Sequence, residues 1–251
     1  MAKVEWRVEG AVREVLLNRA DKRNALDAEM MAELKAAFTA SPAAGERVAV
    51  IRAAGPVFCA GLDMRERAAR PIGISPIEDM LHAIETYPLP VVAVVHGDAI
   101  AGGNELALHC DLVVASTAAR FGMSLAQIGL APSWFLAKKL LEVAGPVTTR
   151  RILLLGDPLP AQRLYDLGVI SHIAEPVELE NAAQAVIRRL ADNAPLSLRA
   201  MKALIVREMA FRDAIVHDDV DQLVEQVRRS QDAQEGMAAR LARRRADFKG
   251  N

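Results

Sequence analysis

Two glycine-containing turns have the residue types that hold an anion on backbone amides. Residues 58–63 read FCAGLD, and residues 96–105 read HGDAIAGGNE. Each turn follows an apolar run typical of a buried strand and comes just before a predicted helix. The first amides of a helix have no internal partner and lie at the positive end of its dipole. Two such helix starts facing each other would stabilise an oxyanion, because glycine leaves room for a substrate to approach.

Glu105 is the candidate acid or base beside this anion site. It follows Gly102 by three residues, so both lie on one face of the helix predicted over residues 101–109. Its apolar neighbours at 106–108 indicate that this helix is buried. Buried glutamates are rare unless they are paired or functional. The alternative to catalysis is therefore a structural salt bridge.

Simpler interpretations of the two turns stay open at this point. Glycine also permits a tight passage from strand to helix, with no role in binding. Gly97 and Gly102 have the glycine spacing of a phosphate-binding P-loop, but Gly103 and Asn104 replace the required lysine and Ser/Thr, which excludes that motif. Other carboxylates that could act as the acid or base are Glu78, Asp79 and Asp98.

The elements that must position these turns are alternating strands and helices. The predicted strands are residues 4–8, 11–17, 47–52, 91–95, 112–115 and 169–174. Helical spacing of apolar residues predicts helices over residues 27–41, 75–86 and 101–109. This alternation indicates an α/β fold. Almost everything after residue 145 is predicted to be helical.

The composition excludes several classes of function. The chain has 251 residues, 52% of them hydrophobic, and 31 basic against 32 acidic residues give a net charge of −1. Such a chain has no overall field that attracts nucleic acid or an anionic membrane. Cys59 and Cys110 alone build neither a disulfide framework nor a metal site. We therefore expect a cytoplasmic protein that acts on a small molecule, without a metal, a nucleic acid or a membrane as partner.

The two turns, taken in this order, resemble the oxyanion motifs of the crotonase superfamily, the enoyl-CoA hydratase/isomerase family. Residues 58–63 are similar to the first motif. Residues 102–107 (GGNELA), followed by Cys110 and Asp111, are similar to the second. The similarity continues over nearly the whole chain, in segments at residues 18–26, 121–122, 129–132, 235–237 and 248–250.

The resemblance implies a spiral of ββα units with a helical C-terminal region, and an acyl-coenzyme A thioester as substrate. Coenzyme A is then part of the substrate, and no separate cofactor is expected. The thioester oxygen would accept hydrogen bonds from the backbone N–H groups of Leu62 and Gly102, with Glu105 as the acid or base.

The same resemblance implies where the rest of the substrate binds. Lys22 and Arg23 would lie near the phosphates of the nucleotide, unless they simply belong to a solvated loop. Ala60 and Asp63 would lie near the adenine. The other expected substrate-binding residues are Asn24, Ala25, Leu26, Gly103, Leu125, Pro132 and Trp134.

Leu125 is where this chain departs from the family pattern. Hydratases of the family have a second glutamate three residues beyond the glycine that matches Gly122, and this position is Leu125 here. Leucine neither accepts a proton nor orients water. We expect an enzyme that forms a thioester enolate, acting on a 2-enoyl-CoA. The alternatives are an isomerase, a decarboxylase or thioester hydrolase, and a non-catalytic acyl-CoA-binding protein.

The C-terminal segment is expected to form a separate helical region. Residues 195–249 are predicted to be amphipathic helices, which seldom fold alone and must pack on the core or on a neighbouring subunit. The resemblance implies a homotrimer, or a hexamer of paired trimers, assembled through this region. We therefore divide the chain into a core of residues 1–194 and a trimerisation region of residues 195–251. The arginine-rich run at residues 240–245 is expected to be a solvated helix face.

Overall fold

The fold of the chain is described from a computed structural model. The structure describes residues 2–69 and 76–250. The predicted helix at 75–86 is observed as α3(Ile77–Glu85), and residue 75 lies outside the described part of the chain.

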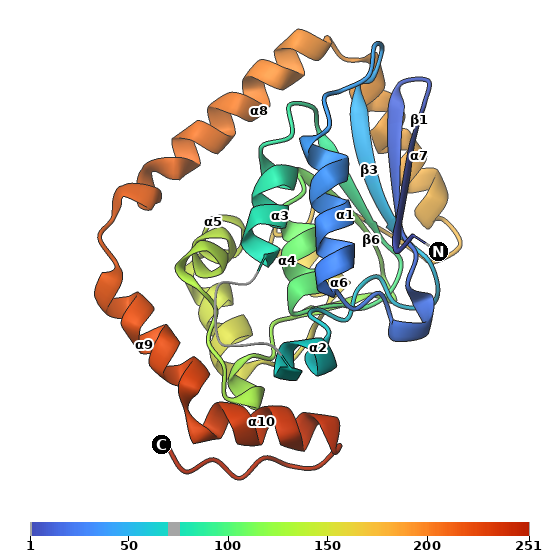
Figure 1. Cartoon of the computed structure of the whole chain (residues 1–251). Coiled ribbons are helices and arrows are strands. Elements are labelled where there is room, and N and C mark those ends of the chain that lie inside the picture. The colour runs from blue at the N-terminus through green and yellow to red at the C-terminus, as the bar shows by residue number, and fades with distance from the viewer. Residues whose placement is uncertain (1, 70–75, 251) are drawn as a thin grey trace.

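A twisted main sheet forms the centre of the molecule, with the strand order β1-β2-β3-β4-β6-β9 (Figure 1). Its first two strands are an antiparallel hairpin, and every later pairing is parallel. The strands are β1(Val4–Glu9), β2(Val12–Leu17), β3(Val48–Ala53), β4(Val91–Val95), β6(Leu112–Ser116) and β9(His172–Ala174). Because β3 and β4 are parallel neighbours, the two glycine turns that follow them come out at the same edge of the sheet.

A second, smaller sheet begins within the second glycine turn. It has the order β5-β7-β8, formed by β5(Ala99–Ile100), β7(Arg120–Gly122) and β8(Leu159–Pro160). The predictions for this part were incomplete, because two- and three-residue strands carry too little apolar periodicity to be recognised.

Helices cover both faces of the main sheet. Figure 1 shows α1, α3 and α4 on one face and α7 on the other. The helices are α1(Ala28–Thr39), α2(Met64–Ala69), α3(Ile77–Glu85), α4(Gly102–Leu108), α5(Trp134–Arg150), α6(Ala161–Asp166), α7(Leu179–Asp192), α8(Pro195–Met209), α9(Asp218–Arg229) and α10(Gln231–Leu241). Shorter helical turns are η1(Ala20–Lys22), η2(Ala126–Ile128), η3(Arg151–Leu155) and η4(Ala210–Ala214).

Alternate residues of the central strands bury into two different cores. Val48, Val50, Val92, Val94 and Val114 pack against α7. The residues between them face the larger core, which holds α1, α3 and α4. Burial on both faces explains why these strands read as continuous apolar runs, and it fixes the strand register.

The C-terminal helices form an arm that leaves the core and returns to it (Figure 1). Helix α8 is anchored by Lys202, whose ammonium lies 2.6 Å from the Asp111 carboxylate and donates to the Leu89 carbonyl oxygen at 3.1 Å. Helix α10 then packs against η2 and α2 beneath the core. The helical character expected of this region is confirmed, whereas the division of the chain at residue 194 stays a prediction.

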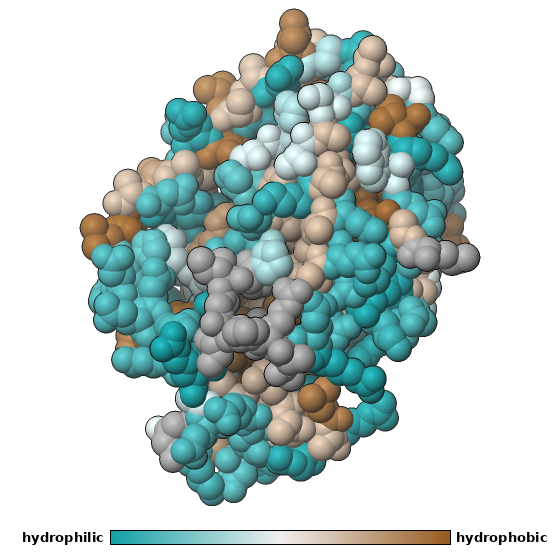
Figure 2. All heavy atoms as spheres, in the orientation of Figure 1, coloured by the Kyte–Doolittle hydropathy of each residue, from teal (hydrophilic) through white to brown (hydrophobic). Residues whose placement is uncertain are grey.

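The arm exposes many apolar side chains. Large hydrophobic residues that are at least half exposed on or next to α8 and α9 are Leu196, Met201, Leu204, Ile205, Phe211, Val216 and Leu223. Figure 2 shows apolar atoms along the outer left edge of the molecule, where this arm runs. Among the described helices, none is long and apolar enough to cross a membrane.

Candidate active site

The two glycine turns meet through backbone hydrogen bonds. The Ile100 amide donates to the Cys59 carbonyl oxygen at 2.9 Å, and the Cys59 amide donates to the Asp98 carbonyl oxygen at 3.1 Å. This approach excludes side chains at the contact. A Cβ atom on Gly103 would lie 2.2 Å from the Cys59 oxygen, so Gly103 is required for packing.

Two backbone amides are left without partners where the turns meet. In the first turn, the Leu26 amide donates to the Gly61 oxygen and the Asp63 amide donates to the Leu26 oxygen, which leaves the Leu62 N–H between them unused. In the second, Gly102 is the first residue of α4, so its N–H has no helical acceptor. Within the described part of the chain, neither amide donates a hydrogen bond.

Both amides border the same cavity, and the chain bends sharply to present them. Leu62 and Gly102 line this cavity. A Cβ atom built on Gly102 would lie only 3.4 Å from the Gly61 Cα, so the two turns touch at this point. The residue before Gly102 is Ala101, whose φ of 50° and ψ of −116° are strained for an alanine. Its amide donates to the Gly122 carbonyl oxygen at 2.7 Å, which holds the strained backbone in place.

Glu105 lies inside this cavity with its carboxylate unpaired. Its side chain is fully buried, and neither carboxylate oxygen has a hydrogen-bond partner among the described residues. Burial penalises the charged form and raises the pKa of Glu105 from 4.5 to about 8. The structural salt bridge considered above is therefore absent from the described residues. An unpaired buried carboxyl group beside two free amides is typical of a catalytic acid or base.

No charged side chain next to Glu105 forms a salt bridge with its carboxylate among the described residues. One turn along α4, the imidazole Nδ1 of His109 donates to the Glu105 backbone oxygen at 2.8 Å and lies 3.8 Å from its carboxylate. Burial lowers the pKa of His109 to about 4, so this imidazole is uncharged near neutral pH. Lys139 also acts on the pKa of Glu105 through its charge, but its ammonium is paired with Glu85 and Glu142.

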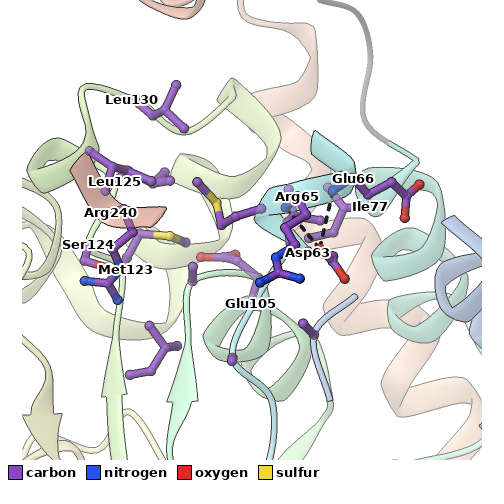
Figure 3. A pocket seen from close by; sticks show the side chains of 18 of the residues that line it. Asp63, Arg65, Glu66, Ile77, Glu105, Met123, Ser124, Leu125, Leu130 and Arg240 are labelled. Carbon is purple, nitrogen blue, oxygen red and sulfur yellow. Dashed lines mark hydrogen bonds between the residues drawn. The ribbon is translucent and has the colours of Figure 1, made fainter. Parts of the chain in front are cut away.

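The cavity has a volume of about 780 Å³, large enough for an extended ligand. Figure 3 shows Glu105 at its centre, with Met123, Ser124 and Leu125 on one side and Asp63 and Arg65 on the other. Leu125 lines the wall, as do Leu130 and Ile77. The cavity around the acid or base thus has both apolar and charged walls.

Most of the residues expected to bind substrate line this cavity. These are Lys22, Arg23, Ala25, Ala60, Leu62, Asp63, Gly102, Glu105, Leu125 and Pro132. Asp63 also forms an ion pair with Arg19 at 2.8 Å and accepts the amide of Arg65, so it orients the loop and caps α2. Of the alternative carboxylates, Glu78 lines the cavity, whereas Asp79 pairs with Lys35 at 2.8 Å away from it.

Four other residues expected to bind substrate are not among the described residues that line the cavity, and their binding role stays a prediction. Asn24 is buried, and its amide group donates to the backbone oxygens of Ala54 and Val57. Leu26 is 1% exposed and belongs to the core, and Gly103 packs against Cys59. These three residues hold the two turns in position.

Trp134 is the fourth of these residues. Trp134 is the first residue of α5. Its indole ring stacks on the His217 ring, with the two centroids 4.5 Å apart. The stacking turns the indole toward the arm. Sequence spacing near Pro132 could not show this, because His217 lies 83 residues further along the chain.

Arg240 and Arg243 are exposed, as expected for a solvated arginine run, and both also line the cavity. Arg240 lies in the last turn of α10, and Arg243 follows just beyond the helix with a φ of 54°. Arg244 instead pairs with Glu235 at 2.7 Å. No signal in the sequence reveals the role of the first two, because only the return of α10 to the core places them here.

Comparison with known proteins defines the family. The family model for enoyl-CoA hydratase/isomerase matches residues 7–251. The 2,3-dehydroadipyl-CoA hydratase of Escherichia coli is 31% identical over 244 residues, which are 93% of this chain and 93% of that protein. The carnitinyl-CoA dehydratase of Proteus mirabilis is 30% identical over 256 residues, covering 96% of each.

A solved structure shows the same fold. Methylmalonyl-CoA decarboxylase complexed with 2S-carboxypropyl CoA superposes with a TM-score of 0.90 at 25% identity, over 99% of this chain and 98% of that one. The chain belongs to the enoyl-CoA hydratase/isomerase family of the crotonase superfamily. The expected crotonase-like α/β fold is confirmed.

The buried carboxyl group of Glu105 makes stability depend on pH in a defined direction. Between its unfolded pKa of 4.5 and its folded pKa of about 8, the folded chain keeps a proton that the unfolded chain has released. This contribution to stability is complete below about pH 4.5 and is lost as pH rises through about 8. Glu105→Gln keeps the shape without the titration. Wild type should therefore lose more than about 1 kcal/mol relative to this variant between those values.

Urea denaturation of both proteins at several pH values measures this difference. Titrating groups far from Glu105 are common to both proteins and cancel in the comparison. Parallel curves of unfolding free energy against pH would contradict the assignment of a shifted pKa to Glu105.

Proposed function

We propose that this protein is an acyl-CoA enzyme that stabilises a thioester enolate and acts on a 2-enoyl-CoA. The observation that carries the proposal is the unpaired, buried Glu105 beside the two free amides of Leu62 and Gly102. The relatives named above support the substrate class, because their names all refer to a coenzyme A thioester. Coenzyme A enters as part of the substrate, and we propose no further cofactor.

The proposed mechanism uses two groups of this chain. The thioester oxygen accepts hydrogen bonds from the Leu62 and Gly102 amides, which stabilise the negative charge that develops on it. Glu105 moves the proton at the carbon next to the thioester. With a pKa of about 8 it is mostly protonated near neutral pH, so it can donate to the enolate carbon and be reprotonated afterwards.

Leu125 favours a second candidate reaction on the same enolate. Hydration also needs a group that activates water, and the wall facing the cavity at this position is a leucine side chain. A shift of the double bond needs only one carboxyl group that removes a proton from one carbon and returns it to another. Isomerisation of an enoyl-CoA is therefore the alternative that this residue supports.

Turnover of a panel of thioesters tests the proposal. Crotonyl-CoA, a 3-enoyl-CoA, malonyl-CoA and a saturated acyl-CoA are incubated with the protein, and the products are identified by NMR and mass spectrometry. Hydration or double-bond migration that is abolished by Glu105→Gln supports the proposal. Binding of all four without any conversion would instead indicate a non-catalytic acyl-CoA-binding protein.

The amide of Gly102 is tested by adding a side chain to it. A Cβ atom there would lie 3.0 Å from the Ile77 Cδ1 atom and would narrow the approach to the amide. Gly102→Val should lower kcat by about two orders of magnitude, as the loss of an oxyanion hydrogen bond does elsewhere, and Gly102→Ala should lower it less. Far-ultraviolet circular dichroism and affinity for free coenzyme A check the fold. Unchanged turnover by a folded Gly102→Val variant would contradict the assignment.

Leu125 is tested by restoring a carboxyl group. If water activation is what the cavity lacks, Leu125→Glu should raise the hydration rate of crotonyl-CoA by about 10²- to 10⁴-fold over wild type. Leu125→Gln is the matched control, because glutamine has nearly the same shape as glutamate and is also polar, but cannot take a proton. Fast hydration by the wild-type protein would show that Leu125 is no handicap. Equal gains from both variants would show that polarity, and not proton transfer, is responsible.

We also propose that the protein is a homotrimer, or a hexamer of two trimers, assembled through its C-terminal arm. The exposed apolar residues of α8 and α9 support this, because an unpaired apolar face of this kind needs a partner. Leu204 and Ile205 are adjacent on α8 and are 62% and 65% exposed.

Charges on this face should break the assembly. The double variant Leu204→Asp, Ile205→Asp should shift the sedimenting mass from trimer or hexamer to monomer, because two carboxylates cannot be buried in an apolar interface. Val177→Asp is the control, since Val177 is 84% exposed on a loop outside the arm. Sedimentation of the wild-type protein as a monomer at micromolar concentration would contradict the proposal.

A further inference from the structure

The cavity has two chemically different sides around Glu105. On one side, the loop containing Lys22 and Arg23 is fixed to the first glycine turn by the ion pair of Arg19 with Asp63. On the other side lie Ser124 and Leu125, and Figure 3 places the Arg240 guanidinium beside Ser124, across the cavity from Asp63. A ligand that reaches both sides passes Glu105 and the two amides on its way.

Arg240 has no countercharge within the described part of the chain. Its side chain forms no hydrogen bond or ion pair with a described residue. Arg19 of the same cavity differs, since it pairs with both Asp27 and Asp63. Glu105 does not serve as the countercharge, because its carboxyl group is largely neutral near neutral pH. A cation that lines a cavity without a protein partner is suited to an anionic ligand group.

The segment beside Arg240 is joined directly to the anion site. The Gly122 carbonyl oxygen accepts the amide hydrogen of Ala101, the residue before Gly102. Ser124 and Leu125 follow within three residues and line the cavity. A thioester carbonyl held by the two amides thus has the loop of Lys22 and Arg23 on one side and Ser124 and Arg240 on the other.

We infer that the acyl group of the substrate ends in a carboxylate, and that Arg240 binds this carboxylate with the Ser124 hydroxyl as a second donor. The inference rests on the proposed function and on the family resemblance, which implies that the nucleotide lies at Lys22 and Arg23; the acyl chain then extends to the opposite side. The apolar wall formed by Leu125 and Leu130 then contacts the methylene groups between the thioester and the carboxylate. Arg240 selects the substrate and takes no part in proton transfer.

Binding of saturated thioesters tests the inference without any turnover. Dissociation constants are measured by isothermal titration calorimetry for succinyl-, glutaryl- and adipyl-CoA. Each is compared with the neutral thioester of the same carbon number, butyryl-, valeryl- or hexanoyl-CoA, and free coenzyme A is measured alongside. At least one carboxylated thioester should bind about 10- to 100-fold more tightly than its neutral partner, as expected for a hydrogen bond to a charged group.

Arg240→Gln should remove this preference and leave the affinity for free coenzyme A unchanged. Arg245→Gln is the matched control, since Arg245 is an exposed arginine of the same segment that does not line the cavity. Equal binding of carboxylated and neutral thioesters by wild type would overturn the inference and leave the proposed function intact. A loss of free coenzyme A affinity in Arg240→Gln would assign Arg240 to a phosphate and overturn it as well. Binding of none of the thioesters would contradict the proposed function itself.

Discussion

The close approach of two backbone segments at one edge of the main sheet is the constraint on which the rest of the site depends. A Cβ atom on Gly97 would lie 2.3 Å from the Pro56 oxygen, and one on Gly61 would lie 2.8 Å from the Ile100 oxygen. Such distances leave no room for any side chain. Because the turns after β3 and β4 can touch only through glycine, the amides of Leu62 and Gly102 come to border one cavity. The parallel strands bring both turns to the same edge of the sheet, and the glycines let the two backbones come into contact.

The same approach explains the unusual state of Glu105. Every residue of α4 is buried, because the helix begins at the contact between the turns and runs into the core. A carboxyl group on the inner face of this helix loses its water and finds no protein donor. Burying this unpaired carboxyl group costs folding free energy, and so does the strained backbone of Ala101. Folded proteins tolerate both kinds of cost at functional sites. Burial and not a neighbouring charge therefore sets the protonation state of Glu105.

The elements that depend on local sequence patterns could be predicted from the sequence. The hairpin of β1 and β2, the cap of α1 at Asp27 and the strand β4 follow from patterns within ten or so residues, and the structure confirms them. The neighbours of Trp134 and Arg240 could not be predicted, for the opposite reason. Their surroundings are set by the arm, which brings His217 to the indole and α10 to the cavity from far along the chain. No local pattern encodes where such an arm returns.

Leu125 changes what Glu105 can do, beyond removing a second catalytic carboxylate. Two carboxyl groups in one dry cavity titrate as a pair, and each raises the proton affinity of the other. With a leucine on that wall, Glu105 is the one carboxyl group among the described lining residues that is both fully buried and unpaired. Desolvation is then the main influence on its pKa, and its proton stays available near neutral pH. A cavity of this kind favours reactions in which one group both gives and takes a proton beside a stabilised enolate. The chemistry of the site thus depends on the apolar side chain of Leu125 as well as on the carboxyl group of Glu105.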